Sequence, residues 1–382
     1  MKYSVINLLV QTVVASVALA APLEKRAPKT LNLSFDVVLT NNNDTGVPVQ
    51  SRDETIQIQY RDLQYKTQIT MGSNKQSLYV ALDTGSSNLW FPSTHVTCEN
   101  GVSCKSYGTF NEKTSTTYKN LSIPIYANYV DGSNAFGYYA TDDYYFADGT
   151  KLPNLQFGLI TQDGKYSGLL GIGLEKQEDT PQKYPNFPFA LKNAGIIDHA
   201  AYSLYLNKPD AQSGNILFGG VDTAKYDGDL TILDVANYPW VGVQVQSYTL
   251  PDGTTHELQI NAALDSGTTY IGLIPSVGRP ILDALGVDDS GYTYCDSVNF
   301  DDHLTFNFDG VSIKIPYTLL FTDQGYNMCR SRIFLEDNDN SGNFFGDTFL
   351  QNAYVAYNLD TLKIGLAQAN YATASNVVDF WF

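Results

Sequence analysis

Basic residues are scarce in this chain of 382 residues. It contains 23 Lys and Arg against 40 Asp and Glu, a formal net charge of −17, and only 16% of its residues are charged. Nucleic acid is bound by clusters of basic side chains, so this surplus of acidic residues argues against a nucleic-acid-binding protein. Because 43% of the residues are hydrophobic, the composition predicts folded domains with substantial cores rather than a disordered chain.

Long apolar runs are lacking after the first residues of the chain. Residues 1–20 combine a basic start, a mostly apolar stretch and a small-x-small site at 18–20, the pattern of a secretory signal peptide. The alternative is a membrane anchor, but the apolar stretch is short and is broken by Asn7 and Gln11. The C-terminal residues 377–382 are too few for the hydrophobic tail of a lipid-anchor signal. The sequence therefore predicts a secreted, extracellular protein with no membrane anchor.

Two candidate processing sites follow the signal peptide. Lys25-Arg26 is a dibasic pair, which is typical of cleavage by a dibasic-specific protease; the alternative is a pair of solvated charges. Residues 21–52 are predicted to form a pro-segment that ends at Arg52, so the sequence predicts a zymogen. Without residues 1–52 the chain keeps 18 basic and 37 acidic residues. This acidity fits work at low pH, where protonation of carboxylates reduces self-repulsion.

One short phrase occurs twice in the chain. It reads Leu82-Asp83-Thr84-Gly85-Ser86 and then Leu264-Asp265-Ser266-Gly267-Thr268. Two copies in matching contexts are not expected by chance from average composition, so they indicate two related halves, which we place at residues 53–227 and 228–382. Each phrase is followed by two apolar residues and a glycine, at 169–171 and 344–346. We expect a strand there beside each aspartate loop, with the glycine allowing close backbone approach.

Short β runs with turn residues between them dominate the pattern. Residues 57–60, 65–71, 78–82 and 89–91 all read as strands, rich in β-branched and aromatic side chains. Helical stretches are few, and the clearest is 188–194, with proline near its start and glycine after its end. The sequence therefore predicts an all-β fold.

Cysteine and histidine are rare, with four of each. The cysteines are Cys98, Cys104, Cys295 and Cys329. An even number in a secreted chain predicts disulfides, and three pairings are possible in principle. The duplicated halves favour Cys98–Cys104 and Cys295–Cys329. A metal site is the weaker alternative, because no histidine is spaced as a ligand beside them.

The sequon at Asn120 is the only one beyond residue 52 and predicts N-glycosylation there.

Each position of the repeated phrase has a chemical role in a site built on two carboxylates. If the internal symmetry brings Asp83 and Asp265 together, they can share one proton and divide the roles of general acid and base. The hydroxyl that follows can bond into the core or to the other loop, the glycine permits the tight turn, and the last hydroxyl can donate to the carboxylate. These supporting residues are Thr84, Gly85, Ser86, Ser266, Gly267 and Thr268. A water between the aspartates would attack a carbonyl without metal, cofactor or covalent intermediate.

These residues resemble the active-site loops of the pepsin-like aspartic proteases, and most closely those of the secreted aspartic proteases of yeasts. The resemblance rests on residues 81–90 and 263–269 for the two loops, and on landmarks at 168–173, 201–206, 217–222 and 345–350. It runs through almost all of residues 53–372. It implies a bilobal, almost all-β fold with a cleft between the lobes and one catalytic aspartate from each. It also implies a monomeric endopeptidase that takes protein or peptide substrates and binds pepstatin-type inhibitors.

Two other functions compete with this interpretation. A catalytically inactive relative would use the cleft only for binding, but such relatives usually lose an active-site aspartate or its hydroxyl neighbours, and both loops are intact here. A glycosidase also uses two carboxylates, yet its mechanism does not require two copies of this phrase. Proteolysis of denatured haemoglobin at acidic pH, blocked by pepstatin, separates all three.

A flap is the next feature that the resemblance implies. Tyr129 matches the flap tyrosine, Trp90 matches the tryptophan that supports it, and Asp131-Gly132 is a hairpin-turn signal. The alternative is that both aromatic side chains are core residues. The residue after the tyrosine is usually glycine in the family but is Val130 here, and a β-branched residue stiffens the hairpin.

Small residues stand two positions before each aspartate. By resemblance, Ala81 and Ala263 line the pockets on either side of the cut bond, where relatives usually have a branched aliphatic residue. Roomier pockets predict a preference for bulky hydrophobic substrate residues. The alternative is that neighbouring side chains, such as Val130, refill the space.

Overall fold

The structure is a computed structural model. It describes residues 28–40, 62–98, 104–129, 134–163, 168–178, 180–208, 211, 213–236 and 240–382. The predicted signal peptide, the processing residues Lys25, Arg26 and Arg52, and the flap residues Val130, Asp131 and Gly132 lie outside these ranges.

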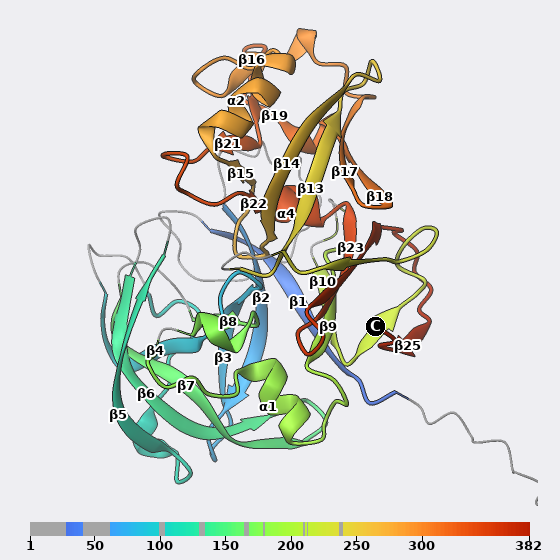
Figure 1. Cartoon of the computed structure of the whole chain (residues 1–382). Helices are drawn as coiled ribbons and strands as arrows, with labels where there is room; N and C mark the ends of the chain where they lie inside the picture. Colours follow the sequence, from blue (N-terminus) through green and yellow to red (C-terminus); the bar gives the residue numbers. More distant parts are fainter. Residues whose placement is uncertain are drawn as a thin grey trace, which may run out of the picture.

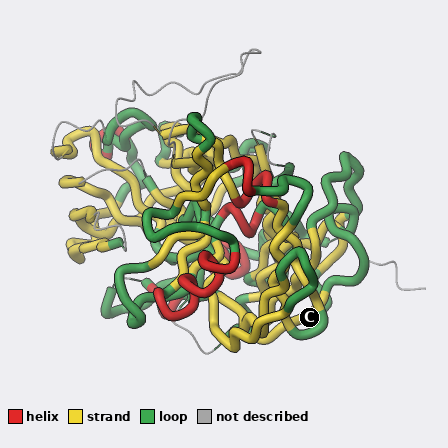
Figure 2. The backbone as a smooth tube through the Cα atoms, turned by 90° about the horizontal axis from the view of Figure 1, so that it is seen from above, coloured by secondary structure: helices red, strands yellow, loops and turns green. Residues whose placement is uncertain are grey.

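Strands make up most of the regular secondary structure of the described residues, as predicted, and helices are few and short (Figure 2). One large sheet holds β1 (Leu31–Thr40), β2 (Asp62–Met71), β3 (Gln76–Asp83), β4 (Leu89–Cys98), β5 (Lys119–Asn128), β6 (Asn134–Tyr145), β7 (Lys151–Asp163), β8 (Leu169–Gly171), β9 (Ala201–Tyr205), β10 (Ser213–Phe218), β12 (Thr231–Asp234), β23 (Ala353–Asn358) and β24 (Lys363–Gln368). Its order is β12-β24-β23-β9-β10-β1-β2-β3-β8-β4-β7-β6-β5.

A second sheet belongs to the latter part of the chain. It contains β13 (Gly242–Thr249), β14 (Thr255–Leu264), β15 (Ile271–Leu273), β17 (His303–Phe308), β18 (Val311–Pro316), β21 (Ile333–Leu335) and β22 (Phe344–Phe345). Two small sheets join β11 (Gly220–Asp222) to β25 (Val377–Asp379), and β16 (Tyr292–Tyr294) to β20 (Met328–Ser331) and β19 (Phe321–Asp323).

The helices are short elements between strands. They are α1 (Phe187–Asn193), α2 (Pro275–Ala284), α3 (Tyr317–Leu320) and α4 (Asp347–Leu350), with 3-10 turns η2 (Glu112–Thr114), η3 (Glu175–Gln177) and η4 (Cys295–Ser297). The predicted helix at 188–194 is confirmed as α1, which has proline in its first turn and is followed by Gly195 in the left-handed region.

The two halves of the sequence meet in the large sheet. β12, β24 and β23 of the second half continue the sheet beside β9 and β10 of the first half. Figure 1 shows the second sheet in the upper part of the molecule, β3–β8 in the lower left part, and β1, β9, β10 and β23 between them. The ends of β3 and β14, which carry the repeated phrase, therefore come from opposite parts of the molecule and meet where the parts join.

The first strand comes from the segment predicted to be removed. β1 lies between β2 and β10 in the large sheet, paired antiparallel with both. Phe35 of β1 is only 1% exposed and packs edge-on against Tyr65, so this strand contributes to the core as well as to the sheet.

Candidate active site

The two aspartates of the repeated phrase lie side by side. Asp83 is the last residue of β3 and Asp265 directly follows β14, and each carboxyl faces the glycine of the other loop. A Cβ built on Gly85 would lie 2.5 Å from Asp265 Oδ1, and one on Gly267 would lie 2.6 Å from Asp83 Oδ1. Any side chain at either glycine would therefore collide with the aspartate of the other loop.

Each carboxyl is held by its own loop in the same way. The Gly85 N–H donates to Asp83 Oδ1 at 2.8 Å, and the Ser86 hydroxyl donates to Asp83 Oδ2 at 2.5 Å. In the second loop the Gly267 N–H donates to Asp265 Oδ1 at 2.8 Å, and Thr268 Oγ1 donates to Asp265 Oδ2 at 2.7 Å. The matching bonds make the site nearly symmetric, so each loop can stabilise a carboxylate.

The hydroxyls after the aspartates join the two loops. Thr84 Oγ1 donates to the Leu264 carbonyl at 2.7 Å and accepts the Ser266 N–H at 2.9 Å. Reciprocally, Ser266 Oγ donates to the Leu82 carbonyl at 3.0 Å and accepts the Thr84 N–H at 3.2 Å. The sequence predicted that these hydroxyls bond either into the core or to the other loop. In the structure, both of them bond to the other loop.

Burial and the neighbouring carboxyl change the proton affinity of the pair. Asp83 is 6% exposed and Asp265 is 8% exposed. Desolvation and the charge of Asp265 raise the pKa of Asp83 above its ordinary value, while the hydrogen bond from Ser86 lowers it in part. Because Asp83 binds its proton more tightly than an ordinary aspartate, the site can hold one proton beside a second carboxyl.

The strands that follow each phrase along the chain support the loops as predicted. β8 runs parallel to β3 with Gly171 opposite Asp83, and β22 runs parallel to β14 with Phe345 opposite Leu264. The Ile172 N–H donates to the Asp83 carbonyl at 2.9 Å, which fixes the loop backbone. A Cβ on Gly346 would lie 2.1 Å from the Thr268 carbonyl oxygen, so only glycine fits there.

Trp90 and Tyr129 are in contact. The Trp90 indole N–H donates to the Tyr129 hydroxyl at 2.5 Å, and their rings lie 6.2 Å apart. Trp90 is 1% exposed and packs in a cluster with Ile125 and Tyr139, so its supporting role and its core role coincide. Tyr129 directly follows β5, next to the flap residues outside the described ranges.

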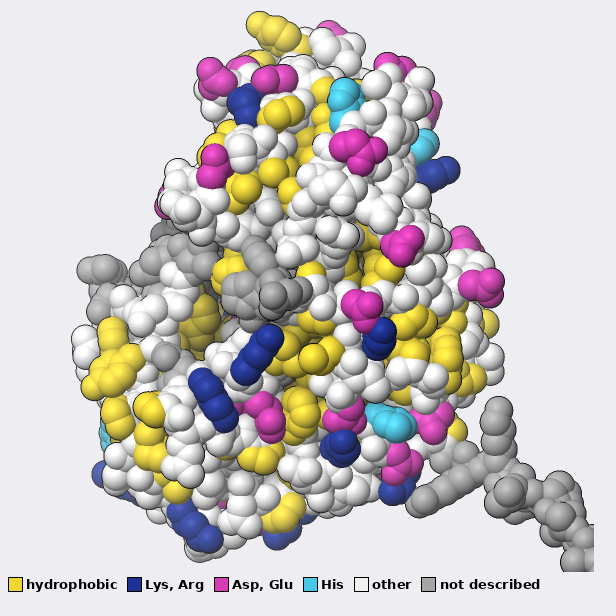
Figure 3. Space-filling model, viewed as in Figure 1, with side chains coloured by type: hydrophobic (Ala, Val, Ile, Leu, Met, Phe, Trp, Pro, Cys, Tyr) yellow, Lys and Arg dark blue, Asp and Glu magenta, His cyan; other side chains and the backbone are white. Residues whose placement is uncertain are grey.

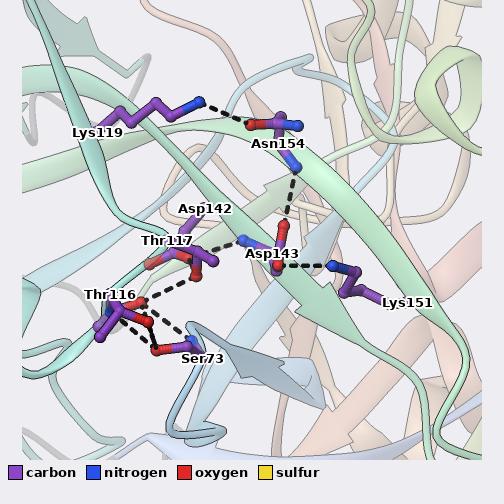
Figure 4. Close-up of polar contacts among 9 residues, drawn as sticks. Ser73, Thr116, Thr117, Lys119, Asp142, Asp143, Lys151 and Asn154 are labelled. Atoms are coloured by element: carbon purple, nitrogen blue, oxygen red, sulfur yellow. Dashed lines mark hydrogen bonds and ion pairs between the residues drawn. The ribbon is translucent and has the colours of Figure 1, made fainter.

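Polar side chains hold the base of the hairpin formed by β5 and β6 (Figure 4). Thr117 Oγ1 donates to Asp142 Oδ1 at 2.5 Å, and Lys151 of β7 pairs with Asp143 at 3.0 Å. The Thr116 N–H donates to Ser73 in the β2–β3 turn at 2.8 Å. These contacts fix the root of the hairpin that ends beside Tyr129.

The predicted pocket residues are buried to different extents. Ala81 of β3 is 8% exposed, and Ala263 of β14 is fully buried. Ala263 lies opposite Phe344 of β22, whose ring packs edge-on against Trp240 at 5.0 Å. Ala263 is therefore closed off from solvent, whereas Ala81 keeps a small exposed surface.

Both disulfides have the predicted pairing. Cys98–Cys104 and Cys295–Cys329 join residues within the first and the second half respectively. Asn120 lies exposed on β5, an edge strand, and its side-chain oxygen accepts the Ser122 N–H at 2.6 Å. No cluster of potential metal ligands occurs among the described residues, and none of their helices is long and apolar enough to cross a membrane.

Sequence reasoning missed Asp347, at the start of α4. It is 2% exposed, and neither of its carboxyl oxygens has a hydrogen-bond partner among the described residues. Burial and the charge of Asp265 raise the pKa of Asp347 well above its ordinary value, opposed by Arg332. The available signal was a single charged residue inside the apolar run of residues 344–350.

The amino-acid sequence of this chain matches a known protein family and several known proteins. Residues 64–369 match the family described as Eukaryotic aspartyl protease, a range that includes both aspartate loops. The chain is similar to Candidapepsin-1 of Candida albicans (strain WO-1), 37% identical over 391 residues that cover 97% of this chain and 98% of the relative. It is also similar to Candidapepsin-3 and Candidapepsin-4 of the same strain. Candidapepsin-3 is 34% identical over 97% of this chain and 98% of its own length, and Candidapepsin-4 is 34% identical over 93% and 88%.

Proposed function

This chain belongs to the eukaryotic aspartyl protease family and is a peptide-bond hydrolase, and from that premise we propose that Asp83 and Asp265 are its catalytic pair. The observation that carries the proposal is the pair of buried, neighbouring carboxyls, each held by a glycine N–H and a hydroxyl of its own loop. Such a pair can hold one proton and one negative charge in the same site.

The proposed reaction uses one water molecule. The ionised carboxylate takes a proton from the water, whose oxygen attacks the peptide carbonyl carbon, while the protonated carboxyl gives its proton to the carbonyl oxygen. In the second step the C–N bond breaks as the leaving nitrogen takes the proton from the protonated carboxyl, while one hydroxyl of the tetrahedral intermediate gives its proton to the other carboxylate. The proton is returned in each turnover, so activity is expected to be highest at acidic pH, where one carboxyl is protonated.

The direct test is cleavage of denatured haemoglobin by the purified protein across pH 3–8. We expect activity that falls toward neutral pH and is blocked by pepstatin. Activity that keeps rising through pH 8 contradicts a shared-proton pair. Pepstatin binding without cleavage would instead indicate an inactive relative.

The flap is proposed to close over the substrate. Tyr129 and residues 130–132 follow β5, and the bond from Trp90 to the Tyr129 hydroxyl supports a fixed tyrosine position. Closure would exclude water from the reacting bond. Val130 in place of the usual glycine is expected to make this hairpin stiffer than in relatives.

We further propose a preference for bulky hydrophobic residues around the cut bond. The proposal depends mainly on Ala81, since Ala263 is fully buried. The test is a peptide-library profile of the wild type and Ala81→Ile. Added carbons at this wall should shift the preference before the cut bond toward smaller residues, by about 1–3 kcal/mol in relative kcat/KM. An unchanged cleavage profile in Ala81→Ile would mean that Ala81 does not line that pocket.

Secretion, maturation and modification belong to the same proposal. The relatives named Secreted aspartic protease 1 and 3 support an extracellular destination, as do the two disulfides. Residues 1–20 would be removed as a signal peptide and residues 21–52 as a pro-segment, with lobes at 53–227 and 228–382. Asn120 would carry an N-linked glycan, and the mature enzyme would act as a monomer on protein or peptide substrates.

A further inference from the structure

The loop after β8 reaches the Asp83 loop through a side chain. Its backbone already holds the Asp83 loop at two points, since the Gly173 N–H donates to the Ser86 carbonyl at 2.7 Å and Ser87 Oγ donates to the Leu174 carbonyl at 2.6 Å. The chain then turns into η3, whose last residue is Gln177.

The amide of Gln177 bonds to two backbone groups. Its Nε2 donates to the Gly85 carbonyl at 3.2 Å, and its Oε1 accepts the Leu174 N–H at 2.9 Å. A Cβ on Gly173 would lie 2.9 Å from Gln177 Oε1, so the absence of a side chain at Gly173 leaves the room that this amide occupies. The Gln177 side chain is thus fitted between its own turn and the aspartate loop.

We propose that Gln177 is a positioning residue for Asp83. Gly85 donates its N–H to Asp83 Oδ1 and presents its carbonyl to Gln177, so both polar groups of this residue are fixed. The Gly85 carbonyl belongs to the peptide unit that leads into Ser86, whose hydroxyl donates to Asp83 Oδ2. Gln177 therefore sets the orientation of the peptide unit between the two groups that hold the Asp83 carboxyl. The inference rests on the proposed catalytic role of Asp83.

The second loop is held from α4 at the two carbonyls that follow Gly267. The Asp347 N–H donates to the Thr268 carbonyl at 2.8 Å, and the Thr348 N–H donates to the Thr269 carbonyl at 3.1 Å. Backbone donors of α4 cannot be removed by a substitution, whereas the amide of Gln177 can. Thr348 Oγ1 also donates to the Thr269 carbonyl at 3.2 Å, so each loop has side-chain support, at the Gly85 carbonyl in the first and at the Thr269 carbonyl in the second.

Three variants test the role of Gln177, with kcat and KM for one peptide substrate measured from pH 3 to pH 7. Gln177→Leu keeps the side-chain size and removes both bonds. We expect kcat to fall about three- to tenfold while KM stays within about twofold, as for one lost hydrogen bond to the loop. Lys176→Ala, at the exposed neighbouring position of η3, is the control and should retain wild-type values.

Gln177→Glu gives the sharper readout. A protonated Glu can donate to the Gly85 carbonyl and accept from Leu174, but an ionised one repels that carbonyl. We expect near wild-type kcat at the lowest pH and an added loss as the pH rises through the ionisation of Glu. Other ionisable groups nearby are Glu175, Glu178 and Lys183 on the same loop, and the catalytic pair beyond Gly85. All of these groups are also present in the wild type, so comparing the pH profile of the variant with that of the wild type removes their contribution.

Two results would overturn the inference. Wild-type kcat and pH profile in Gln177→Leu would mean that the amide does not position the loop. Equal losses in both Gln177 variants at every pH would mean that a donor to the Gly85 carbonyl does not restore activity, so the proposed bond is not what positions the loop. If Gln177→Leu does not fold, the pH dependence of Gln177→Glu decides alone. Turnover by Asp83→Asn would instead refute the proposed function, which is a separate outcome.

Discussion

At the scale of single residues, the repeated phrase predicted most of the site. The sequence assigned the tight turns and nearby N–H groups to Gly85 and Gly267, and the structure has both N–H bonds. It could not predict that each glycine faces the aspartate of the other loop, because that contact depends on how two distant strands approach. Gln177 was missed for the same reason, since no local pattern marks a residue that acts across a loop, whereas Asp347 did stand out as the one charged residue in residues 344–350.

The cross-loop hydroxyl of Thr84 is expected to stabilise the whole molecule. In Thr84→Val the Ser266 N–H loses its partner inside the protein, because Thr84 is fully buried. An unsatisfied buried donor costs about 1–3 kcal/mol, and the free energy of unfolding should fall by that amount. Urea unfolding measures it, with Thr231→Val as the control, since that hydroxyl makes only one long exposed bond. Equal stability of the two variants would show that the cross-loop bonds contribute little.

At the scale of elements, strands with clear alternation were predicted best. The strands at 65–71, 78–82 and 89–91 are confirmed inside β2, β3 and β4. The strand expected beside each aspartate loop is confirmed as β8 and β22. α2 was not predicted, because Pro280 interrupts its helical pattern and Pro275 alone marks its start.

The place of β1 bears on maturation. Its residues form six pairs with β10 and five with β2, so removal of the pro-segment leaves two strand edges without a partner. Residues 57–60, predicted as a strand, are near enough in sequence to fill that place. We expect N-terminal sequencing of the secreted protein to give Asp53 as its first residue. A start at Ala27 would refute the second cut and leave β1 as a permanent strand.

At the scale of the whole molecule, the negative net charge is concentrated in the second half, because basic residues are scarce there. Residues 228–382 contain 19 Asp and Glu but only 5 Lys and Arg. Figure 3 shows Asp and Glu scattered over the upper part of the molecule, while most Lys and Arg lie over the lower part. The overall charge was predictable from composition, whereas the separation in space required the fold to place each half.

Stability should fall as the pH rises from about 4 to about 8. Burial raises the pKa of Glu178 to about 8, and the pKa values of Asp83 and Asp347 are also raised. A raised carboxyl pKa means that the folded state binds the proton more tightly than the unfolded state. The stabilisation is complete below the ordinary pKa values and is lost as the pH approaches the folded ones, by at most about 1.4 kcal/mol per pH unit for each group.

Thermal unfolding at several pH values checks this prediction. The melting temperature should decrease from pH 4 to pH 8, and Glu178→Gln should show a shallower decrease because one contributing carboxyl is gone. A melting temperature that rises over this range, or an identical slope in the variant, would contradict the assignment.

The central claim is that Asp83 and Asp265 act as one catalytic pair, and the most direct measurement is kcat of Asp83→Asn and Asp265→Asn at acidic pH. An amide keeps the shape of each side chain but cannot share the proton. Both variants should stay folded and lose at least about a thousandfold in kcat, while Asp309→Asn at an exposed turn keeps full activity. Turnover close to wild type in either variant of the pair would contradict the account.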